Sequence, residues 1–251
     1  MRFLLQQKKK TMKIGIKEHE SETRILSIRI PIKQAQLEGE LTIPANAEGI
    51  ILFAHGSGSS RHSPRNQYVA QVIRQSGNAT LLFDLLTPAE EIEDNITAAL
   101  RFDIRLLAQR LVVATHWIRN DPETQRLRIG YFGSSTGGGA ALVAAAELGK
   151  DISAVVSRGG RPDLAGGALA HVQSPTLLIV GEYDEVVIRL NEEALAKLRC
   201  EKELTIIPRA THLFEEKGAL EQVARLAADW FQRHLHCPSP TTNHLKGKTD
   251  K

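Results

Sequence analysis

The chain has 251 residues, of which 42% are hydrophobic and 24% charged, a balance typical of one large globular domain with a well-buried core. Its formal net charge is +3, but residues 1–17 contribute +6 and residues 236–251 contribute +2, so the segment between them carries about −5. The basic balance therefore belongs to the ends of the chain, and a nucleic-acid-binding face is not expected.

The ends and the cysteines predict a cytoplasmic protein without a metal centre. The opening "MRFLLQQKKK" has the wrong order of charged and apolar residues for a secretory signal, and no apolar run is long enough to span a bilayer. Cys200 and Cys237 form no disulfide framework, and no Cys/His cluster has zinc spacing. We expect a flexible basic segment over residues 1–20, one folded domain over 21–236, and a disordered tail over 237–251.

Two kinds of strand pattern follow each other along the chain. Residues 24–44, "RILSIRIPIKQAQLEGELTIP", alternate apolar and polar side chains, which is typical of an antiparallel pair with one exposed face. After Gly49 the apolar runs are continuous, which is typical of a parallel sheet buried on both faces. These runs are "GIILFAHGSG", "ATLLFDLL", "LRIGYFGSS", "ISAVVSRGG" and "PTLLIVGEYDE".

Helical periodicity separates the apolar runs. The predicted helices cover residues 66–75, 103–119, 136–148, 189–199 and 216–235. Strand and helix thus alternate, and this predicts a doubly wound α/β layer with right-handed crossovers. In such a sheet the functional groups gather beyond the carboxyl ends of the strands.

Residues 133–137, Gly-Ser-Ser-Thr-Gly, fit the pattern G-x-S-x-G between an apolar strand and an alanine-rich helix. The glycines permit a sharp turn that lifts the Ser135 hydroxyl above the sheet as a nucleophile. The amide of Thr136, in the first turn of the helix, then faces a developing oxyanion. Glycine-rich turns also serve close packing alone, so the motif needs partners elsewhere in the chain.

A serine nucleophile needs a base, and the base needs an acid, in the chain order Ser, acid, His. His212 follows the last predicted strand and is the expected base. Asp184 follows the preceding strand, 28 residues earlier, and is the expected acid, with Glu182 and Glu185 as competitors.

The loop His55-Gly56-Ser57-Gly58, after the first buried strand, should supply the second oxyanion donor, and we assign the Ser57 amide to that role. His55 itself is expected to anchor the loop.

The quoted motifs together resemble a known family. "FAHGSGSSRHSPRN", "FGSSTGG", "SRGGRPDL", "LIVGEYDEVV" and "THLFEE" are similar to the dienelactone-hydrolase-like branch of the α/β-hydrolases, over about residues 25–235. The resemblance implies the α/β-hydrolase fold, with a mostly parallel sheet, N-terminal antiparallel strands and helices on both faces. Dienelactone hydrolase itself carries a cysteine nucleophile where this chain has Ser135, which weakens transfer of the lactone substrate. Similar proteins occur fused to phosphoribosyltransferase-like domains, which implies a functional link to such a protein.

Two other classes of protein compete with this interpretation. A dinucleotide-binding domain is suggested by Gly56-Ser57-Gly58 after a strand and by Asp84 at the end of the next one, 26 residues after Gly58. However, Arg61 stands where that fingerprint needs a third glycine, and no Gly-Lys-Ser/Thr sequence forms a Walker A loop. A non-catalytic scaffold with the hydrolase fold is the other alternative.

Several cations follow the predicted strands near the site. Arg61, His62 and Arg65 follow the oxyanion loop, and Arg158 and Arg161 follow another strand. One interpretation is that these cations make structural ion pairs within the protein. The alternative is that some of them bind a carboxylate or phosphate of the substrate, and the candidates for this role are Arg61, His62 and Arg158. The segment "TPAEEIEDN" is too short for a substantial lid, so we expect an open cleft.

The sequence thus predicts a serine hydrolase that cleaves an ester-type bond of a small substrate through an acyl-enzyme, without a metal or organic cofactor, nucleic acid or membrane. Oligomeric state is left open.

Overall fold

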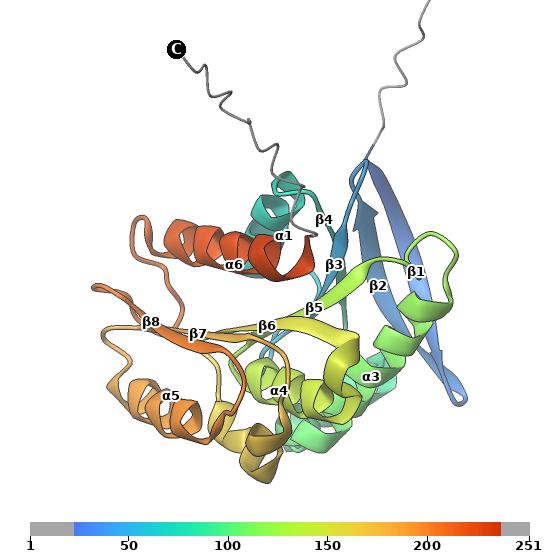
Figure 1. Ribbon diagram of the computed structural model, residues 1–251. Coiled ribbons are helices and arrows are strands. Elements are labelled where there is room, and N and C mark those ends of the chain that lie inside the picture. Colours follow the sequence, from blue (N-terminus) through green and yellow to red (C-terminus); the bar gives the residue numbers. More distant parts are fainter. Residues whose placement is uncertain (1–22, 237–251) are drawn as a thin grey trace, which may run out of the picture.

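The computed structural model describes residues 23–236 and shows one sheet between two layers of helices (Figure 1). The strands are β1 (Arg24–Ile32), β2 (Ala35–Ile43), β3 (Gly49–Ala54), β4 (Asn78–Phe83), β5 (Arg128–Ser134), β6 (Ile152–Arg158), β7 (Thr176–Gly181) and β8 (Lys202–Ile207). The α-helices are α1 (Pro64–Gln75), α2 (Pro88–Thr97), α3 (Ile104–Asn120), α4 (Thr136–Leu148), α5 (Glu185–Lys197) and α6 (Ala219–Leu235). Short 3₁₀ segments are η1 (Leu100–Phe102), η2 (Gly149–Asp151) and η3 (Pro162–His171). The predicted tails, 1–20 and 237–251, lie outside the described residues.

The sheet has the strand order β1-β2-β4-β3-β5-β6-β7-β8. β2 pairs antiparallel with both β1 and β4, and every other pair is parallel. The predicted doubly wound, mostly parallel sheet with N-terminal antiparallel strands is therefore confirmed. All residues of β3, β4 and β7 are buried, which is why their sequences are continuous apolar runs.

Helices cover both faces of the sheet. α1 and α6 lie on one face, and α3, α4 and α5 lie on the other (Figure 1). The α6 side of the core is closed by large side chains such as Trp230 and Phe231, both almost fully buried. On the other face α4 presents Ala140 and Ala141 to the sheet, so the helix that follows Ser135 packs close to the strands. Within residues 23–236, none of the helices has the length and apolar character needed to cross a membrane.

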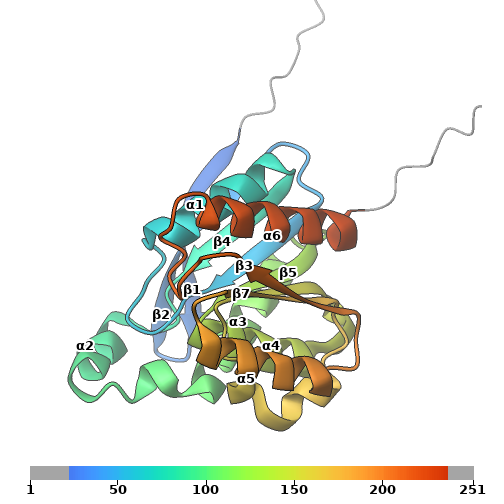
Figure 2. The same ribbon diagram turned by 90° about the vertical axis from the view of Figure 1, so that its left-hand side faces the viewer.

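Helix α2 is absent from the helices predicted from the sequence, where this segment is only expected to be too short for a substantial lid. Its start is fixed by a capping box, in which Thr87 and Glu90 exchange side-chain-to-backbone hydrogen bonds, and by Pro88 in the first turn. Ala89, Ile92 and Ile96 recur at helical spacing in this short helix, but all three are exposed and Asp94 is its one buried residue, so the stripe does not pack on the core. Figure 2 shows α2 standing away from both helical layers.

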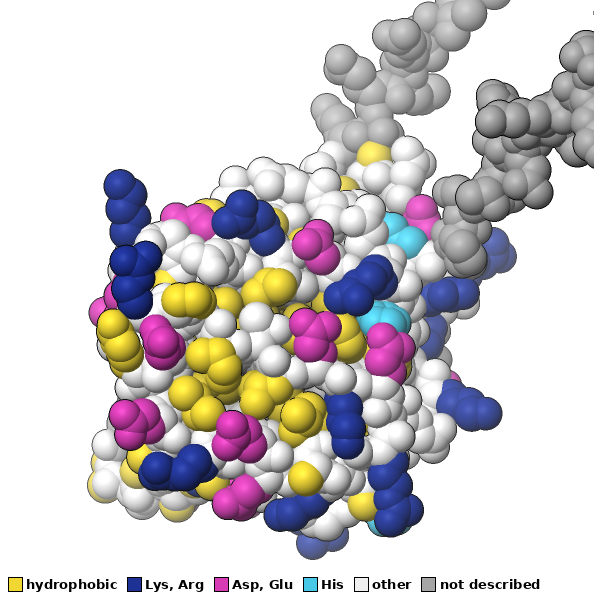
Figure 3. Space-filling view, turned by 60° about the vertical axis from the view of Figure 1, so that its left-hand side comes forward, with side chains coloured by type: hydrophobic (Ala, Val, Ile, Leu, Met, Phe, Trp, Pro, Cys, Tyr) yellow, Lys and Arg dark blue, Asp and Glu magenta, His cyan; other side chains and the backbone are white. Residues whose placement is uncertain are grey.

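β8 is an edge strand of the sheet, at the end of the molecule where α5 covers one face and α6 the other (Figure 1). Figure 3 looks onto this side of the molecule, where hydrophobic side chains gather between charged ones. Among the strands of residues 23–236, β8 pairs only with β7, and Ile206 of β8 is an exposed large hydrophobic side chain. Lys202 and Glu203 are exposed at the start of the strand, and such charges discourage pairing of a free edge with other chains.

Candidate active site

Ser135 lies at a sharp turn between β5 and α4. Its backbone has φ 50° and ψ −122°, a conformation that is strained for a residue with a side chain. The turn is held from both sides, because the Ser135 N–H donates to the carbonyl of Arg158 at 3.2 Å and its carbonyl accepts from the N–H of Arg161 at 3.0 Å. Ser135 is half-buried, whereas Ser134 is buried and donates its hydroxyl to Asn66 Oδ1 at 3.1 Å.

The glycines of the motif are required by close packing of α4 on β3 and β5. A Cβ atom at Gly137 would lie 2.6 Å from the carbonyl oxygen of His55 and closer still to that of Ala54. A Cβ atom at Gly133 would lie 2.6 Å from the Cα of Gly138. Side chains at either glycine would therefore push the helix away from the strands and displace Ser135.

Asp184 and His212 meet at the same edge of the sheet. His212 Nδ1 lies 2.6 Å from Asp184 Oδ2, in a short hydrogen bond. Among the described residues, Asp184 is the one whose side chain bonds to the His212 ring. The competing acid Glu182 instead accepts the backbone N–H of Arg209 at 2.6 Å, and Glu185 is exposed in the first turn of α5.

The His212 ring lies beside the turn that carries Ser135. Gly159 follows Arg158, whose carbonyl accepts the Ser135 N–H. A Cβ atom at Gly159 would lie 3.5 Å from His212 Cε1. No hydrogen bond between Ser135 Oγ and His212 occurs within the described part of the chain. Such bonds between a nucleophile and its base are often long in unliganded enzymes and tighten when substrate binds.

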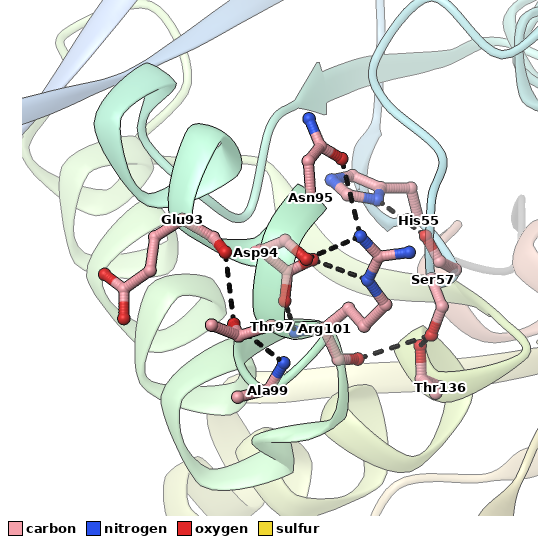
Figure 4. A network of polar contacts seen from close by, with 10 residues as sticks. His55, Ser57, Glu93, Asp94, Asn95, Thr97, Ala99, Arg101 and Thr136 are labelled. Carbon is pink, nitrogen blue, oxygen red and sulfur yellow. Dashed lines mark hydrogen bonds and ion pairs between the residues drawn. The ribbon is translucent and has the colours of Figure 1, made fainter.

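The loop after β3 packs directly on Ser135. A Cβ atom at Gly56 would lie 3.0 Å from the Cβ of Ser135, so the small residue lets the loop approach the turn. Ser57 Oγ lies 3.1 Å from Thr136 Oγ1 and donates to the carbonyl of Arg101 at 3.3 Å (Figure 4). The two residues predicted to form an oxyanion hole are thus linked through their side chains.

His55 anchors this loop. Its Nε2 accepts the backbone N–H of Leu85 at 3.0 Å, and its Nδ1 is 3.0 Å from the carbonyl of Gly56, to which it donates. Burial lowers the pKa of His55, so the ring is neutral at neutral pH and can accept the Leu85 N–H.

His55 should therefore make stability depend on pH. In the unfolded chain a histidine has an ordinary pKa of about 6.5, so below that pH the unfolded state binds a proton that the folded state does not. Stability is then lost as pH falls from about 6.5 toward the lowered pKa of His55. We expect His55→Gln to reduce the loss of unfolding free energy between pH 7.5 and pH 5, measured in urea.

The exposed His116 provides the control, and His116→Gln should retain the pH dependence of the wild type. The pKa of His234 is also lowered by burial, so part of the dependence will remain in both variants. An identical pH dependence in His55→Gln and the wild type would contradict the prediction.

A small cavity of about 40 Å³, partly open to solvent, adjoins the loop after β3. Its walls come from this loop, from the segment after β4, from Thr136 and Leu107, and from α2 and η1. The residues of the last two elements are Glu91, Asp94, Asn95 and Arg101. Sequence reasoning missed all four, and the capping box at Thr87 was the available signal for the wall that carries them.

Arg101 clasps the end of α2. Its backbone N–H donates to Asp94 Oδ1 at 2.9 Å and its Nε to Asp94 Oδ2 at 2.6 Å, while Nη2 donates to the Asp94 carbonyl at 2.9 Å (Figure 4). Burial raises the pKa of Asp94, but the hydrogen bonds from Arg101 outweigh it and leave the pKa below its ordinary value. The backbone carbonyl of Arg101 accepts a hydrogen bond from the Ser57 hydroxyl. The clasp between Arg101 and Asp94 is therefore connected to the loop beside Ser135.

The three candidate substrate contacts have different surroundings. Arg61 pairs with Asp84 and, at 2.7 Å, with Glu38 Oε2, so its charge is neutralised within the protein. The backbone N–H of Arg61 also donates to Asp84 Oδ1 at 2.7 Å. Asp84 is the carboxylate that the dinucleotide-binding alternative needs for its ligand, and here it is bound to Arg61. His62 is exposed. Arg158 is buried and has no ion pair among the described residues.

Two groups of known proteins are similar to this chain at high sequence identity. A solved dienelactone hydrolase from Anabaena variabilis is 60% identical, with a TM-score of 0.84, and the alignment covers 85% of this chain and 99% of that one. Two Mycobacterium tuberculosis proteins, whose curated names designate them provisionally as phosphoribosyl transferases, are 54% identical over 222 residues. The match covers 88% of this chain and 48% of theirs, so the chain spans about half the length of these relatives.

More distant structures share the fold alone. Est1E from Butyrivibrio proteoclasticus is 15% identical, with a TM-score of 0.69 over 83% of this chain and 98% of that chain. The model of the dienelactone hydrolase family matches residues 37–237, which is most of the sequence. Together with the sheet topology and the 60% identity to a solved family member, this match shows that the chain belongs to the dienelactone hydrolase family and has the α/β-hydrolase fold.

Proposed function

We propose that the chain is a serine hydrolase that cleaves an ester-type bond of a small substrate through an acyl-enzyme. Ser135 Oγ attacks the substrate carbonyl while His212 Nε2 accepts the hydroxyl proton. The alcohol leaves with that proton. Water then attacks the acyl-enzyme, again giving a proton to His212, and the acid product leaves as Ser135 regains its hydrogen.

Asp184 and two backbone amides complete the proposed machinery. The 2.6 Å hydrogen bond to Nδ1 fixes the tautomer that leaves Nε2 free to accept a proton, and the carboxylate stabilises the imidazolium that forms. The amides of Ser57 and Thr136 bind the oxyanion, and the hydrogen bond between the side chains of these residues holds the two donors in register. No metal or organic cofactor is needed for these steps.

One observation carries the proposal. Ser135 holds a strained backbone conformation at the edge of the sheet where the Asp184–His212 pair lies, and strain of this kind concentrates at functional sites. A purely structural turn would gain nothing from such strain. A non-catalytic scaffold is therefore the weaker alternative, and nucleotide binding is weakened by the engagement of Asp84 with Arg61.

A fluorophosphonate probe provides the direct test, because it reacts with an activated serine. We expect mass spectrometry to find the probe on Ser135 in the wild type, and no labelling in Ser135→Ala. A panel of esters, thioesters and lactones then identifies the bond that is cleaved. Absence of labelling together with absence of turnover on the whole panel would favour the scaffold alternative.

We further propose that the protein acts in the cytoplasm on a small molecule and works with a phosphoribosyltransferase-like protein. The support for this link is that the Mycobacterium tuberculosis relatives are about twice as long and carry that name. Co-expression of the chain with such a protein, followed by size-exclusion chromatography, tests whether the two associate. Separate elution would count against a physical link.

The clasp between Asp94 and Arg101 should affect turnover through the loop that carries Ser57. Asp94→Asn removes the charge from these hydrogen bonds, so the carbonyl that accepts from Ser57 is held less firmly. We expect kcat on a 4-nitrophenyl ester to fall about tenfold, because small displacements of catalytic donors are costly. Glu93→Gln changes an exposed carboxylate of the same helix and should retain normal kcat. Equal kcat values in the two variants would refute a role for the clasp.

A further inference from the structure

Asn191 is a buried polar residue of α5 that the proposed mechanism does not use. It is 0% exposed, and the other buried residues of the helix are Val187 and Ala194. Its Nδ2 atom donates to the carbonyl of Val187 at 2.8 Å, within the helix, and to the carbonyl of Gly160 at 3.0 Å. The second bond leaves the helix and fastens α5 to the segment that follows β6.

The segment after β6, residues 159–161, supports the Ser135 turn, and we call it the β6 loop. Ser135 donates its N–H to the carbonyl of Arg158, the residue before this loop. Its own carbonyl accepts from the N–H of Arg161, the last residue of the loop. Gly160 lies between these two contacts, so the carbonyl that α5 holds is in the middle of the support for Ser135.

One peptide unit joins α5 to the Ser135 turn. The carbonyl that Asn191 binds and the N–H that Ser135 accepts belong to the same peptide unit, between Gly160 and Arg161. A peptide unit is planar and trans, so its oxygen and its hydrogen point in opposite directions and move together. The hydrogen bond from Asn191 therefore fixes the direction in which the N–H points toward the Ser135 carbonyl. Hydrogen bonds in such a series also polarise one another.

The same helix and loop contact the other two proposed catalytic side chains. Asp184 is the N-cap residue of α5, about two helical turns before Asn191. A Cβ atom at Gly159 would lie 3.2 Å from the carbonyl oxygen of His212. α5 also lies on the same face of the sheet as α4, the helix that follows Ser135 (Figure 1). The link between Asn191 and the β6 loop therefore joins the supports of the nucleophile, the base and the acid.

Stability alone does not account for the amide of Asn191. Its Oδ1 atom is buried and has no hydrogen-bond partner among the described residues. A buried acceptor without a partner costs free energy. The amide cannot be turned around to avoid this cost, because both groups that accept from Nδ2 are carbonyls, which need a donor. An apolar side chain, like those of Val187 and Ala194, would have no unpaired oxygen. The bond to Gly160 is the contact that the amide supplies and an apolar residue would not.

We infer that Asn191 is a positioning residue that, through the β6 loop, holds the strained Ser135 turn in place beside the proposed acid and base. This inference rests on the proposed ester hydrolysis and adds a residue to the support of its site. A strained backbone, here with φ 50°, persists only while its surroundings hold it. Without the bond from Asn191 the turn relaxes and Ser135 Oγ is displaced from the base. Asn191 is fully buried and cannot touch the substrate, so the chemical step slows while binding is kept.

Two variants test the link by kinetics. Asn191→Ala removes both hydrogen bonds. In Asn191→Ser the hydroxyl bonds to the carbonyl four residues earlier, that of Val187, as serines in helices do, but it lacks the amide that reaches Gly160. We expect both variants to lower kcat on a 4-nitrophenyl ester about 10- to 100-fold, with KM within about threefold of the wild type. The rate at which a fluorophosphonate labels Ser135 should fall in parallel. Near-normal kcat in either variant would overturn the inference, and Asn191→Ser serves alone if Asn191→Ala fails to fold.

Asn78→Ala is the matched control for a general loss of stability. Asn78 is also 0% exposed, and its side chain is hydrogen-bonded to those of Ser76 and His236. It begins β4, at the amino edge of the parallel strands, whereas Ser135 follows β5 at their carboxyl edge. We expect Asn78→Ala to be less stable than the wild type but to keep normal kcat at a temperature where it is folded. An equal fall of kcat in Asn78→Ala and in the Asn191 variants would make Asn191 a stabilising residue only and overturn the inference.

Amide hydrogen exchange separates this inference from the proposed function, because it requires no hydrolysis. The N–H groups of Ser135 and Arg161 report on the two bonds that hold the turn. In Asn191→Ser we expect them to exchange at least about tenfold faster than in the wild type or in Asn78→Ala. If the wild type hydrolyses no ester and takes up no probe, the proposed function fails, and this measurement still decides whether Asn191 holds the turn. Equal exchange of these amides in Asn191→Ser and Asn78→Ala would overturn the inference whatever the kinetics.

Discussion

Ser135→Ala should lower kcat for ester hydrolysis by roughly four to six orders of magnitude, the range found when the nucleophile of a serine hydrolase is removed. The reason is that the other parts of the site can still bind the substrate and polarise its carbonyl but cannot form an acyl-enzyme. The free energy of unfolding should fall little, because Ser135 Oγ makes no hydrogen bond within residues 23–236. Alanine also retains a Cβ, so the strained turn is kept.

Ser134→Ala is the matched control, since it removes the neighbouring hydroxyl. The Ser134 hydroxyl is buried and donates a hydrogen bond to Asn66 Oδ1. Its loss should reduce the free energy of unfolding by about 1–3 kcal/mol, while most of the turnover remains. The decisive measurement is single-turnover release of 4-nitrophenol by the two variants at the same enzyme concentration. Near-normal turnover by Ser135→Ala, with a large loss in Ser134→Ala, would transfer the role of nucleophile to Ser134.

The sheet could be predicted because its determinants are local. Runs such as Gly49–Ala54 are apolar at every position since both faces of the strand are covered, and the alternation of Ile28, Ile30 and Ile32 reflects a strand with one covered face. The turn at Ser135 was equally readable, because its glycines are needed by contacts within one strand-turn-helix unit. The helix boundaries were less accurate: α5 begins at Glu185, four residues before the predicted start.

The walls of the site could not be predicted because they depend on distant pairings. Arg61 follows the oxyanion loop in sequence, and only the folded sheet shows that Asp84 and Glu38 neutralise its charge. Conversely, Arg158 resembles any other arginine at a strand end until the structure shows that no carboxylate faces it among the described residues. Partner choice among charged side chains is therefore the information that the fold adds to the sequence.

Gly137→Ala should destabilise the fold by more than about 2 kcal/mol, although glycine-to-alanine changes inside helices usually stabilise them by up to about 1 kcal/mol. The two effects have opposite signs, so the measurement decides between them. A Cβ at Gly137 meets the backbone carbonyls of Ala54 and His55, and backbone cannot move aside as a side chain can. Because these carbonyls belong to the end of β3 and the loop that carries Ser57, relief of the clash must also shift the proposed oxyanion donors.

Gly167→Ala provides the control, because nothing lies within 4 Å of a Cβ at that exposed position. Its unfolding free energy should remain within about 0.5 kcal/mol of the wild type in a urea titration. The same samples should show a loss of kcat in Gly137→Ala at temperatures where the variant is still folded, and no loss in Gly167→Ala. Should Gly137→Ala prove as stable as the wild type, helix propensity would outweigh packing here, and the close approach of α4 to β3 would not be what fixes the position of Ser135.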